Sequence, residues 1–250
     1  MTGPYDIIIL AGQSNAVGYG HGATDYKLKH LSDVWVLDDD QPEEVFAIQE
    51  PWKIRLRQAQ DVYTGSLAVR FADEYIKAGN LQPGRKLLIV HCAAGGTGFC
   101  KSEWGVGNLL YRRMIDLADY ALNLNSENKI VAFLWHQGEH DAFEKNPPEN
   151  YKKQLFEVIS DVRSKYGNMP FIAGDFVNEW KSKNIEICEP IINSIKGVVA
   201  DLGNSAFVET SDLLSNNQTM NNGDDIHFSR ESLHILGERY FETFQKIKQK

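Results

Sequence analysis

Residues 5–16 read YDIIILAGQSNA, an apolar run followed at once by small and polar residues. The run is rich in Ile and lacks the polar alternation of a half-buried strand, which is typical of a parallel strand covered on both faces. Gly12 ends the run, and Ser14 follows in a tight turn. Functional side chains gather at the carboxyl ends of the strands in a parallel sheet. The segment therefore predicts an α/β fold that presents Ser14 at the end of its first strand.

Similar apolar runs recur along the chain, with helix-like stretches between them. The expected strands are residues 5–10, 34–37, 87–91, 130–135, 171–173 and 206–208, and the expected helices are residues 66–78, 109–122, 151–165, 190–201 and 230–246. This alternation predicts a three-layer α/β/α sandwich around a mostly parallel, flavodoxin-like doubly wound sheet. Residues 38–63 are the least regular part and are expected to run over the surface. At 250 residues, the chain is expected to form a single domain spanning residues 1–250.

Composition narrows the classes of partner. The formal net charge of −8 argues against a nucleic-acid partner, and the sequence contains no apolar run long enough for a membrane span. Cys92, Cys100 and Cys188 lack metal-ligand spacing and are expected to be reduced thiols. Met1 to Pro4 lead directly into the first strand without a signal peptide, which predicts a cytoplasmic protein. The oligomeric state is left open.

A glycine-rich loop follows the strand expected at residues 87–91. It reads AAGGTG over residues 93–98 and offers the backbone N–H groups of Gly95 and Gly96 to an oxyanion or a phosphate. A P-loop is disfavoured because Cys100, not glycine, precedes Lys101. A plain strand-to-helix turn is the alternative interpretation.

A third polar segment, WHQGEHD at residues 135–141, has two interpretations. His136, Glu139 and His140 match the H-x-x-E-H pattern of zinc hydrolases, but that chemistry needs a helix to bring both histidines to one face. A strand is expected before His136, and Gly138 interrupts the pattern, so zinc is disfavoured. The alternative is a loop in which the neutral amide of Gln137 donates a hydrogen bond to an oxyanion.

The fourth segment, NGDDIHFS at residues 222–229, precedes the last helix. Asp224 stands three residues before His227 and can turn back to Nδ1, which leaves Nε2 free as a base. Ser229 is expected to cap the helix and to fix the loop that carries His227.

Taken together, these segments resemble the successive sequence blocks of the SGNH hydrolases. They are Gly12-Gln13-Ser14-Asn15, Gly95-Gly96-Thr97, Gln137-Gly138-Glu139 and Asp224-x-x-His227. The similarity is greatest to the sialate O-acetylesterase and acetylxylan esterase branch, because Gln137 stands where most SGNH enzymes carry asparagine. The resemblance implies a serine carbohydrate esterase that hydrolyses O-acetyl groups, acting on acetylxylan or on a sialic acid.

The resemblance also implies roles for individual residues. Ser14 is the expected nucleophile, and Asp224 and His227 complete the triad. The expected oxyanion hole comprises Ser14, Gly95 or Gly96, and Gln137, while the supporting or substrate-binding residues are Gln13, Asn15 and Glu139. No metal or organic cofactor is expected, and the expected partner is an acetylated carbohydrate. The alternatives are a zinc hydrolase built on His136, Glu139 and His140, and an inactive sugar-binding protein.

Overall fold

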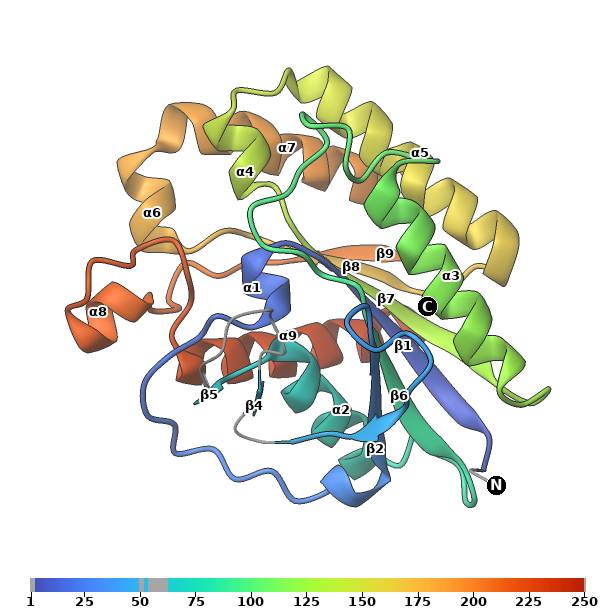
Figure 1. Cartoon of the computed structure of the whole chain (residues 1–250). Coiled ribbons are helices and arrows are strands. Elements are labelled where there is room, and N and C mark those ends of the chain that lie inside the picture. Colours follow the sequence, from blue (N-terminus) through green and yellow to red (C-terminus); the bar gives the residue numbers. More distant parts are fainter. Residues whose placement is uncertain (1–2, 50–51, 54–62, 250) are drawn as a thin grey trace.

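The computed structural model describes residues 3–49, 52–53 and 63–249, and its centre is a twisted sheet (Figure 1). The strands of this sheet are β1 (Tyr5–Gly12), β2 (Val34–Asp38), β3 (Phe46–Ala47), β6 (Lys86–His91), β7 (Lys129–His136), β8 (Phe171–Gly174) and β9 (Ser205–Val208). They lie in the order β3-β2-β6-β1-β7-β8-β9. Neighbouring strands are parallel except β2 and β3. Strands β4 (Trp52–Lys53) and β5 (Tyr63–Thr64) form a separate antiparallel pair.

Helices cover both faces of the sheet (Figure 1). On one face lie α3 (Leu109–Asn123), α5 (Pro148–Tyr166) and α7 (Ile185–Asp201), and on the other lie α2 (Leu67–Lys77) and α9 (Arg230–Lys248). The shorter helices are α1 (Ser14–Val17), η1 (Leu31–Asp33), α4 (Glu139–Phe143), α6 (Asn178–Lys183) and α8 (Asn216–Met220). The chain is therefore an α/β protein with a mostly parallel sheet between two helical layers, which confirms the predicted fold class.

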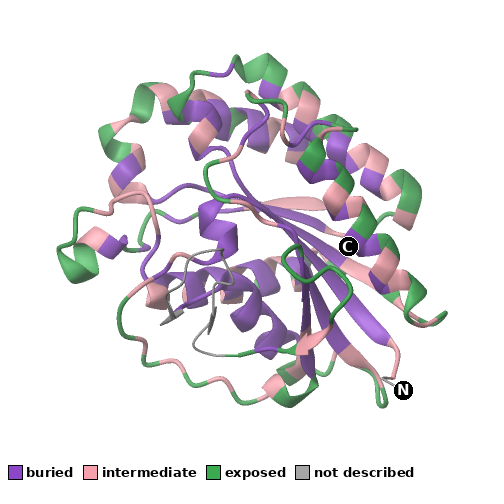
Figure 2. Cartoon of the chain, in the orientation of Figure 1, coloured by how far each residue is buried: buried purple, intermediate pink, exposed green. Residues whose placement is uncertain are grey.

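The first strand shows why the sequence lacks polar alternation. Ile7 and Ile9 pack into the hydrophobic cluster under α3, α5 and α7, whereas Ile8 and Leu10 pack into the cluster under α2 and α9. Every residue of β1 is buried (Figure 2). Because both faces of β1 are covered, apolar side chains are favoured at successive positions.

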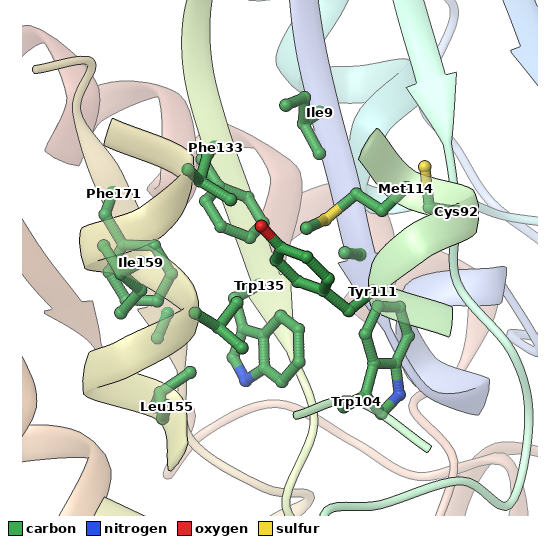
Figure 3. Packing of buried hydrophobic residues seen from close by; sticks show 14 of the residues in the cluster. Ile9, Cys92, Trp104, Tyr111, Met114, Phe133, Trp135, Leu155, Ile159 and Phe171 are labelled. Atoms are coloured by element: carbon green, nitrogen blue, oxygen red, sulfur yellow. The ribbon is translucent and has the colours of Figure 1, made fainter. Parts of the chain in front are cut away.

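Aromatic side chains fill the layer beneath α3 and α5 (Figure 3). Trp135 packs edge-to-face against Trp104 and Phe133, with ring centroids 5.1 and 6.2 Å apart. Such pairs contribute about 0.5–1.5 kcal/mol each beyond the burial of their surface. Because Trp135 directly precedes His136 and Gln137, this packing fixes the end of β7 and the polar residues that follow it.

The structure extends most of the expected elements by a few residues. The largest difference is α7, which was expected at residues 190–201 and instead begins at Ile185, with Pro190 inside the helix. Proline lacks a backbone N–H and usually stands in the first turn of a helix. A helix start predicted at Pro190 is therefore later than the observed start. Burial of Cys188 and Ile191 in the core holds the earlier turn in place. Within the irregular region expected at residues 38–63, residues 39–44 are exposed, and residues 50–51 and 54–62 lie outside the described part of the chain.

Strand order brings three loops together. Strand β1 lies between β6 and β7, with Leu10 opposite His91 and Gly12 opposite His136. The loops that follow these three strands therefore leave the sheet side by side at one edge. The position of β6 between β1 and β2 differs in detail from the 2-1-3-4-5 order of flavodoxin. Among the described helices, none has the length and apolar character needed to cross a membrane.

Candidate active site

Ser14 is the first residue of α1, immediately beyond β1, and is 8% exposed. The turn depends on a close approach to β7, because Gln13 N donates to His136 O over 2.9 Å. Gly12 has a φ of +133°, and a Cβ added there would come within 2.1 Å of His136 O. Only glycine allows this approach. The Ser14 N–H is one of the first-turn donors that an α-helix leaves without a partner of its own.

His227 lies in the loop before α9 and is held by Asp224. Its Nδ1 lies 2.9 and 3.0 Å from the two carboxylate oxygens of Asp224. Partial burial acts to raise the pKa of Asp224, but hydrogen bonds from His227 and Asn216 outweigh it and lower that pKa below its ordinary value. The carboxylate of Asp225 instead pairs with Lys183 over 2.9 Å. The sequence did not single out Asn216, which donates from Nδ2 to Asp224 over 2.8 Å.

Asn15 connects the Ser14 turn to the loop of His227. Its Nδ2 donates to Ile226 O, and its Oδ1 accepts from Phe228 N, each over 3.1 Å. These are the backbone neighbours of His227 on either side. Asn15 is completely buried. Its side chain therefore fixes the position of the His227 backbone relative to the Ser14 turn. In the part of the chain that the structure describes, no hydrogen bond joins Ser14 Oγ to His227 Nε2.

The two candidate glycines differ in their distance from Ser14. The position that a Cβ would take at Gly95 lies 3.8 Å from Ser14 Cβ, whereas the same position at Gly96 has no atom within 4 Å. Ala94 N donates to Gly12 O over 3.0 Å and ties the glycine loop to the end of β1. Gly95 therefore borders Ser14, and Gly96 faces open space.

The side chain of Gln137 is buried and fully engaged. Its Nε2 lies 2.6 Å from Asp141 Oδ2, 3.1 Å from Thr97 O and 3.3 Å from Gln13 Oε1. Its Oε1 accepts from the hydroxyl of Tyr151 over 3.1 Å. Both amide hydrogens thus have protein acceptors. The structure places Gln137 among loops that meet beside Ser14, but its amide does not point an unpaired N–H at a substrate.

Comparison with known proteins identifies the family of this chain. The family model described as carbohydrate esterase, sialic acid-specific acetylesterase matches residues 4–246. The chain belongs to this family. It is a carbohydrate acetylesterase, and the resemblance seen in its sequence blocks is confirmed.

Individual relatives agree in sequence and in fold. The esterase is 25% identical over 251 residues to the probable 9-O-acetyl-N-acetylneuraminic acid deacetylase of Escherichia coli (strain K12), covering 82% of this chain and 76% of the relative. The crystal structure of NanS has a TM-score of 0.77 at 19% identity, with 100% of this chain and 99% of that chain covered. A protein from Arabidopsis thaliana has a TM-score of 0.74 at 22% identity, covering 97% and 98%. These two structures share the fold.

Asp141 organises the loops of the esterase, although its sequence context did not reveal this. Its carboxylate accepts from Phe99 N over 3.0 Å and from Cys100 N over 2.9 Å, both directly after the glycine-rich loop. It also accepts from Gln137 and from Asn146. One buried carboxylate therefore joins the loop after β6 to the loop after β7. The only sequence feature that could have indicated this role is the position of Asp141 at the end of the polar segment of residues 135–141.

The residues of the H-x-x-E-H pattern do not share a helix. His136 ends β7, and its Nδ1 lies 3.0 Å from the hydroxyl of Tyr240 in the core. His140 lies in α4, with Nε2 3.8 Å from Glu144 Oε1. Among the residues described here, no group of three His, Cys, Asp or Glu side chains is arranged to hold a metal ion. His136 and His140 therefore lie in different elements, the end of β7 and the short helix α4, and their spacing of four residues does not place them on one helical face.

Glu139 is completely buried, and its Oε1 accepts from Asn15 Nδ2 over 2.7 Å. Burial raises the pKa of Glu139 above its ordinary value, and the hydrogen bond from Asn15 opposes that shift. Glu139 therefore contacts the site through Asn15.

Tyr19 is a site residue that the sequence did not indicate. Its ring stacks on the imidazole of His227, with centroids 5.3 Å apart and an interplanar angle of 26°. Asn216 Nδ2 donates to Tyr19 O over 2.9 Å as well as to Asp224. The only signal was its position five residues after Ser14, in the segment that leaves α1.

Proposed function

We propose that this esterase hydrolyses O-acetyl esters of a sialic acid through a Ser14–His227–Asp224 triad and an acetyl-enzyme intermediate. The observation that carries the proposal is the bridge made by Asn15, which holds the Asp224-bound His227 beside the turn of Ser14. The family description and the printed name of the Escherichia coli relative favour a sialic acid over acetylxylan. The family match over residues 4–246 supports one esterase domain across residues 1–250.

The reaction begins when Oγ of Ser14 attacks the acetyl carbonyl carbon and its proton passes to Nε2 of His227. Asp224 accepts from Nδ1, fixes the tautomer and stabilises the imidazolium. The tetrahedral intermediate then collapses, His227 protonates the sugar oxygen, and the alcohol leaves. Water, deprotonated by His227, hydrolyses the acetyl-enzyme to acetate and restores Ser14. The described structure has no hydrogen bond between Ser14 and His227, and catalytic hydrogen bonds commonly tighten when substrate binds.

The oxyanion is assigned to the backbone N–H groups of Ser14 and Gly95. Gly95 is chosen over Gly96 because it borders Ser14. Gln137 is assigned a positioning role, since its amide hydrogens already have acceptors on Asp141, Thr97 and Gln13. The Oε1 of Gln13 also accepts from the backbone N–H of His140 over 3.1 Å, so Gln13 supports the same loop.

The deciding experiment is Ser14→Ala, assayed for release of acetate from 9-O-acetyl-N-acetylneuraminic acid. We expect kcat to fall by roughly three orders of magnitude or more while the thermal unfolding midpoint is retained, because triad residues act as a unit. A serine-directed phosphonate is expected to label the Ser14 peptide in mass spectrometry. Ser164→Ala, at an exposed position in α5, is the matched control. Substantial activity in purified Ser14→Ala would refute the assignment. Acetylated xylo-oligosaccharides, assayed in parallel, test the choice of a sialic acid.

A further inference from the structure

Asn216 is completely buried at the start of α8, and each polar atom of its side chain is hydrogen-bonded. Its Nδ2 donates to Asp224 Oδ2 over 2.8 Å and to Tyr19 O over 2.9 Å. Its Oδ1 accepts from His21 N over 2.8 Å. A backbone N–H only donates, whereas a carbonyl and an ionised carboxylate only accept, so these partners fix which end of the amide faces Asp224.

The bonds to Tyr19 and His21 anchor Asn216 to the segment that leaves the Ser14 turn. Gly18 N donates to Ser14 O over 3.0 Å at the end of α1, and Tyr19 follows directly. The amide of Asn216 is therefore held against a stretch of chain that is itself tied to the turn of Ser14.

The backbone of Asn216 binds the loop of His227 as well. Its N–H donates to His227 O over 2.9 Å. Asn15 binds the backbone on either side of His227 from the Ser14 turn. Two buried asparagines from distant parts of the chain thus hold the loop that carries the imidazole.

The carboxylate of Asp224 contacts His227 and Asn216 at the same time. Its oxygens lie 2.9 and 3.0 Å from His227 Nδ1, and Oδ2 also accepts from Asn216. The side chain of Asp224 is 26% exposed, so water competes for these oxygens. A fixed amide donor on Oδ2 restricts the rotation of the carboxylate and keeps it directed at Nδ1.

We propose that Asn216 is a positioning residue for the general base of the esterase, because its amide holds the Asp224 carboxylate at Nδ1 of His227. Nε2 of the imidazole is thereby kept free to take the proton of Ser14. The inference rests on the proposed function, since it takes His227 as the base. Asn216 is completely buried, so it acts on the reaction through Asp224. Its contribution therefore belongs to kcat more than to KM.

The first test compares Asn216→Ala with Asn217→Ala in steady-state kinetics on an acetyl ester. Asn216→Ala is expected to lower kcat by about 10–100-fold, with KM within about threefold of the wild-type value. Asn217→Ala is the matched control, since its side chain bonds to Glu179 and Gly223. Its kcat is expected to stay within about threefold of the wild-type value. Equal losses in the two variants would show that α8 had loosened, and would reject the role of the Asn216 amide.

A double-mutant cycle with Asp224→Ala tests whether Asn216 acts through that carboxylate. Asp224→Ala is expected to lower kcat by about 10³- to 10⁴-fold. In this background, adding Asn216→Ala is expected to cost less than about threefold, because the group that the amide positions is gone. A further loss of about 10–100-fold in the double variant, equal to the loss in the wild-type background, would overturn the inference.

A second substitution keeps the size of the side chain. Asn216→Asp retains an acceptor for His21 N but places an oxygen opposite Asp224 Oδ2. Two carboxylates at this distance repel when both are ionised, so kcat at about pH 8 is expected to fall by about tenfold or more. An unchanged kcat would contradict the proposal. Asn216→Asp carries the test should Asn216→Ala prove unstable in thermal unfolding.

The same assays separate this inference from the proposed function. If Ser14→Ala and Asp224→Ala lose activity while both Asn216 variants keep the wild-type kcat, the triad stands and the positioning role is rejected. If Ser14→Ala or Asp224→Ala remains active, the proposed function itself is rejected.

Discussion

Asn15 donates a hydrogen bond to Glu139, with 2.7 Å between Nδ2 and Oε1. The backbone requires the same orientation of this amide, because Ile226 O can only accept a hydrogen bond and Phe228 N–H can only donate one. That orientation sends Nδ2 to Ile226 O and Oδ1 to Phe228 N. The buried carboxylate therefore supports the Asn15 bonds on both sides of His227.

The first prediction concerns this chain of contacts. Asn15→Ala is expected to lower kcat by about 10–100-fold, because losing buried hydrogen bonds costs about 1–3 kcal/mol. Glu139→Gln is expected to cost about tenfold or less, since the glutamine carbonyl can still accept from Asn15. Steady-state kinetics on an acetyl ester measures both effects, with Asn168→Ala at an exposed position as the control. If Glu139→Gln were as damaged as Ser14→Ala, Glu139 would have a direct catalytic role.

A second prediction separates the adjacent aspartates. Asp224→Asn is expected to lower kcat by about 10³- to 10⁴-fold, because the imidazole loses the group that fixes its tautomer. Asp225→Asn is the matched control. Its carboxylate pairs with Lys183 over 2.9 Å, and exposed pairs of this kind contribute little to stability. Comparable kinetic losses in the two variants would contradict the assignment of Asp224.

A third prediction distinguishes a positioning role of Gln137 from an oxyanion role. Gln137→Ala removes a hydrogen bond from the buried Asp141 carboxylate, whereas the Tyr151 hydroxyl keeps its bond to the backbone O of residue 137. The free energy of unfolding is therefore expected to fall by about 2–3 kcal/mol, together with kcat. A residue that only donated to an oxyanion would lower kcat and leave stability unchanged. Urea unfolding measures the difference, and Gln154→Ala, which removes an exposed hydrogen bond, is the control.

The fourth prediction concerns acid stability. Burial lowers the pKa of His136 from its ordinary value of 6.5 to about 3. Between these pH values the unfolded chain binds a proton at His136 that the folded chain does not. The contribution of neutral His136 to the free energy of unfolding is therefore fully present above the higher pH value and is lost as the pH falls. The slope from this one group is at most roughly 1.4 kcal/mol per pH unit.

His136→Gln removes that group. We expect its free energy of unfolding, measured in urea, to decline less than that of the wild type between about pH 6.5 and about pH 5. Glu139 is buried near His136, and its raised pKa acts in the opposite direction, so the comparison is made between the two proteins at each pH. Parallel pH profiles would show that His136 does not contribute to acid sensitivity.

Local sequence determined much of the fold. The apolar run of residues 5–10 specified a strand buried on both faces, and each strand expected from such a run lies within the observed sheet. Ser229 was expected to cap the last helix, and its hydroxyl accepts from Ser232 N. Burial periodicity and capping are local properties, which is why they can be read without a structure.

The sequence also pointed to Ser14, Asp224 and His227 as candidate triad residues, because each lies in a short block of neighbouring residues that can be recognised locally. Only the tertiary structure decided how the blocks meet. The meeting of the loops after β6, β1 and β7 put Gly95 rather than Gly96 against Ser14, and it gave the amide of Gln137 an acceptor in Thr97 O. Tyr19, Asn216 and Asp141 gained their roles from contacts between segments far apart in the chain. Sequence spacing cannot specify such contacts, because they depend on strand order and on how side chains pack at the edge of the sheet.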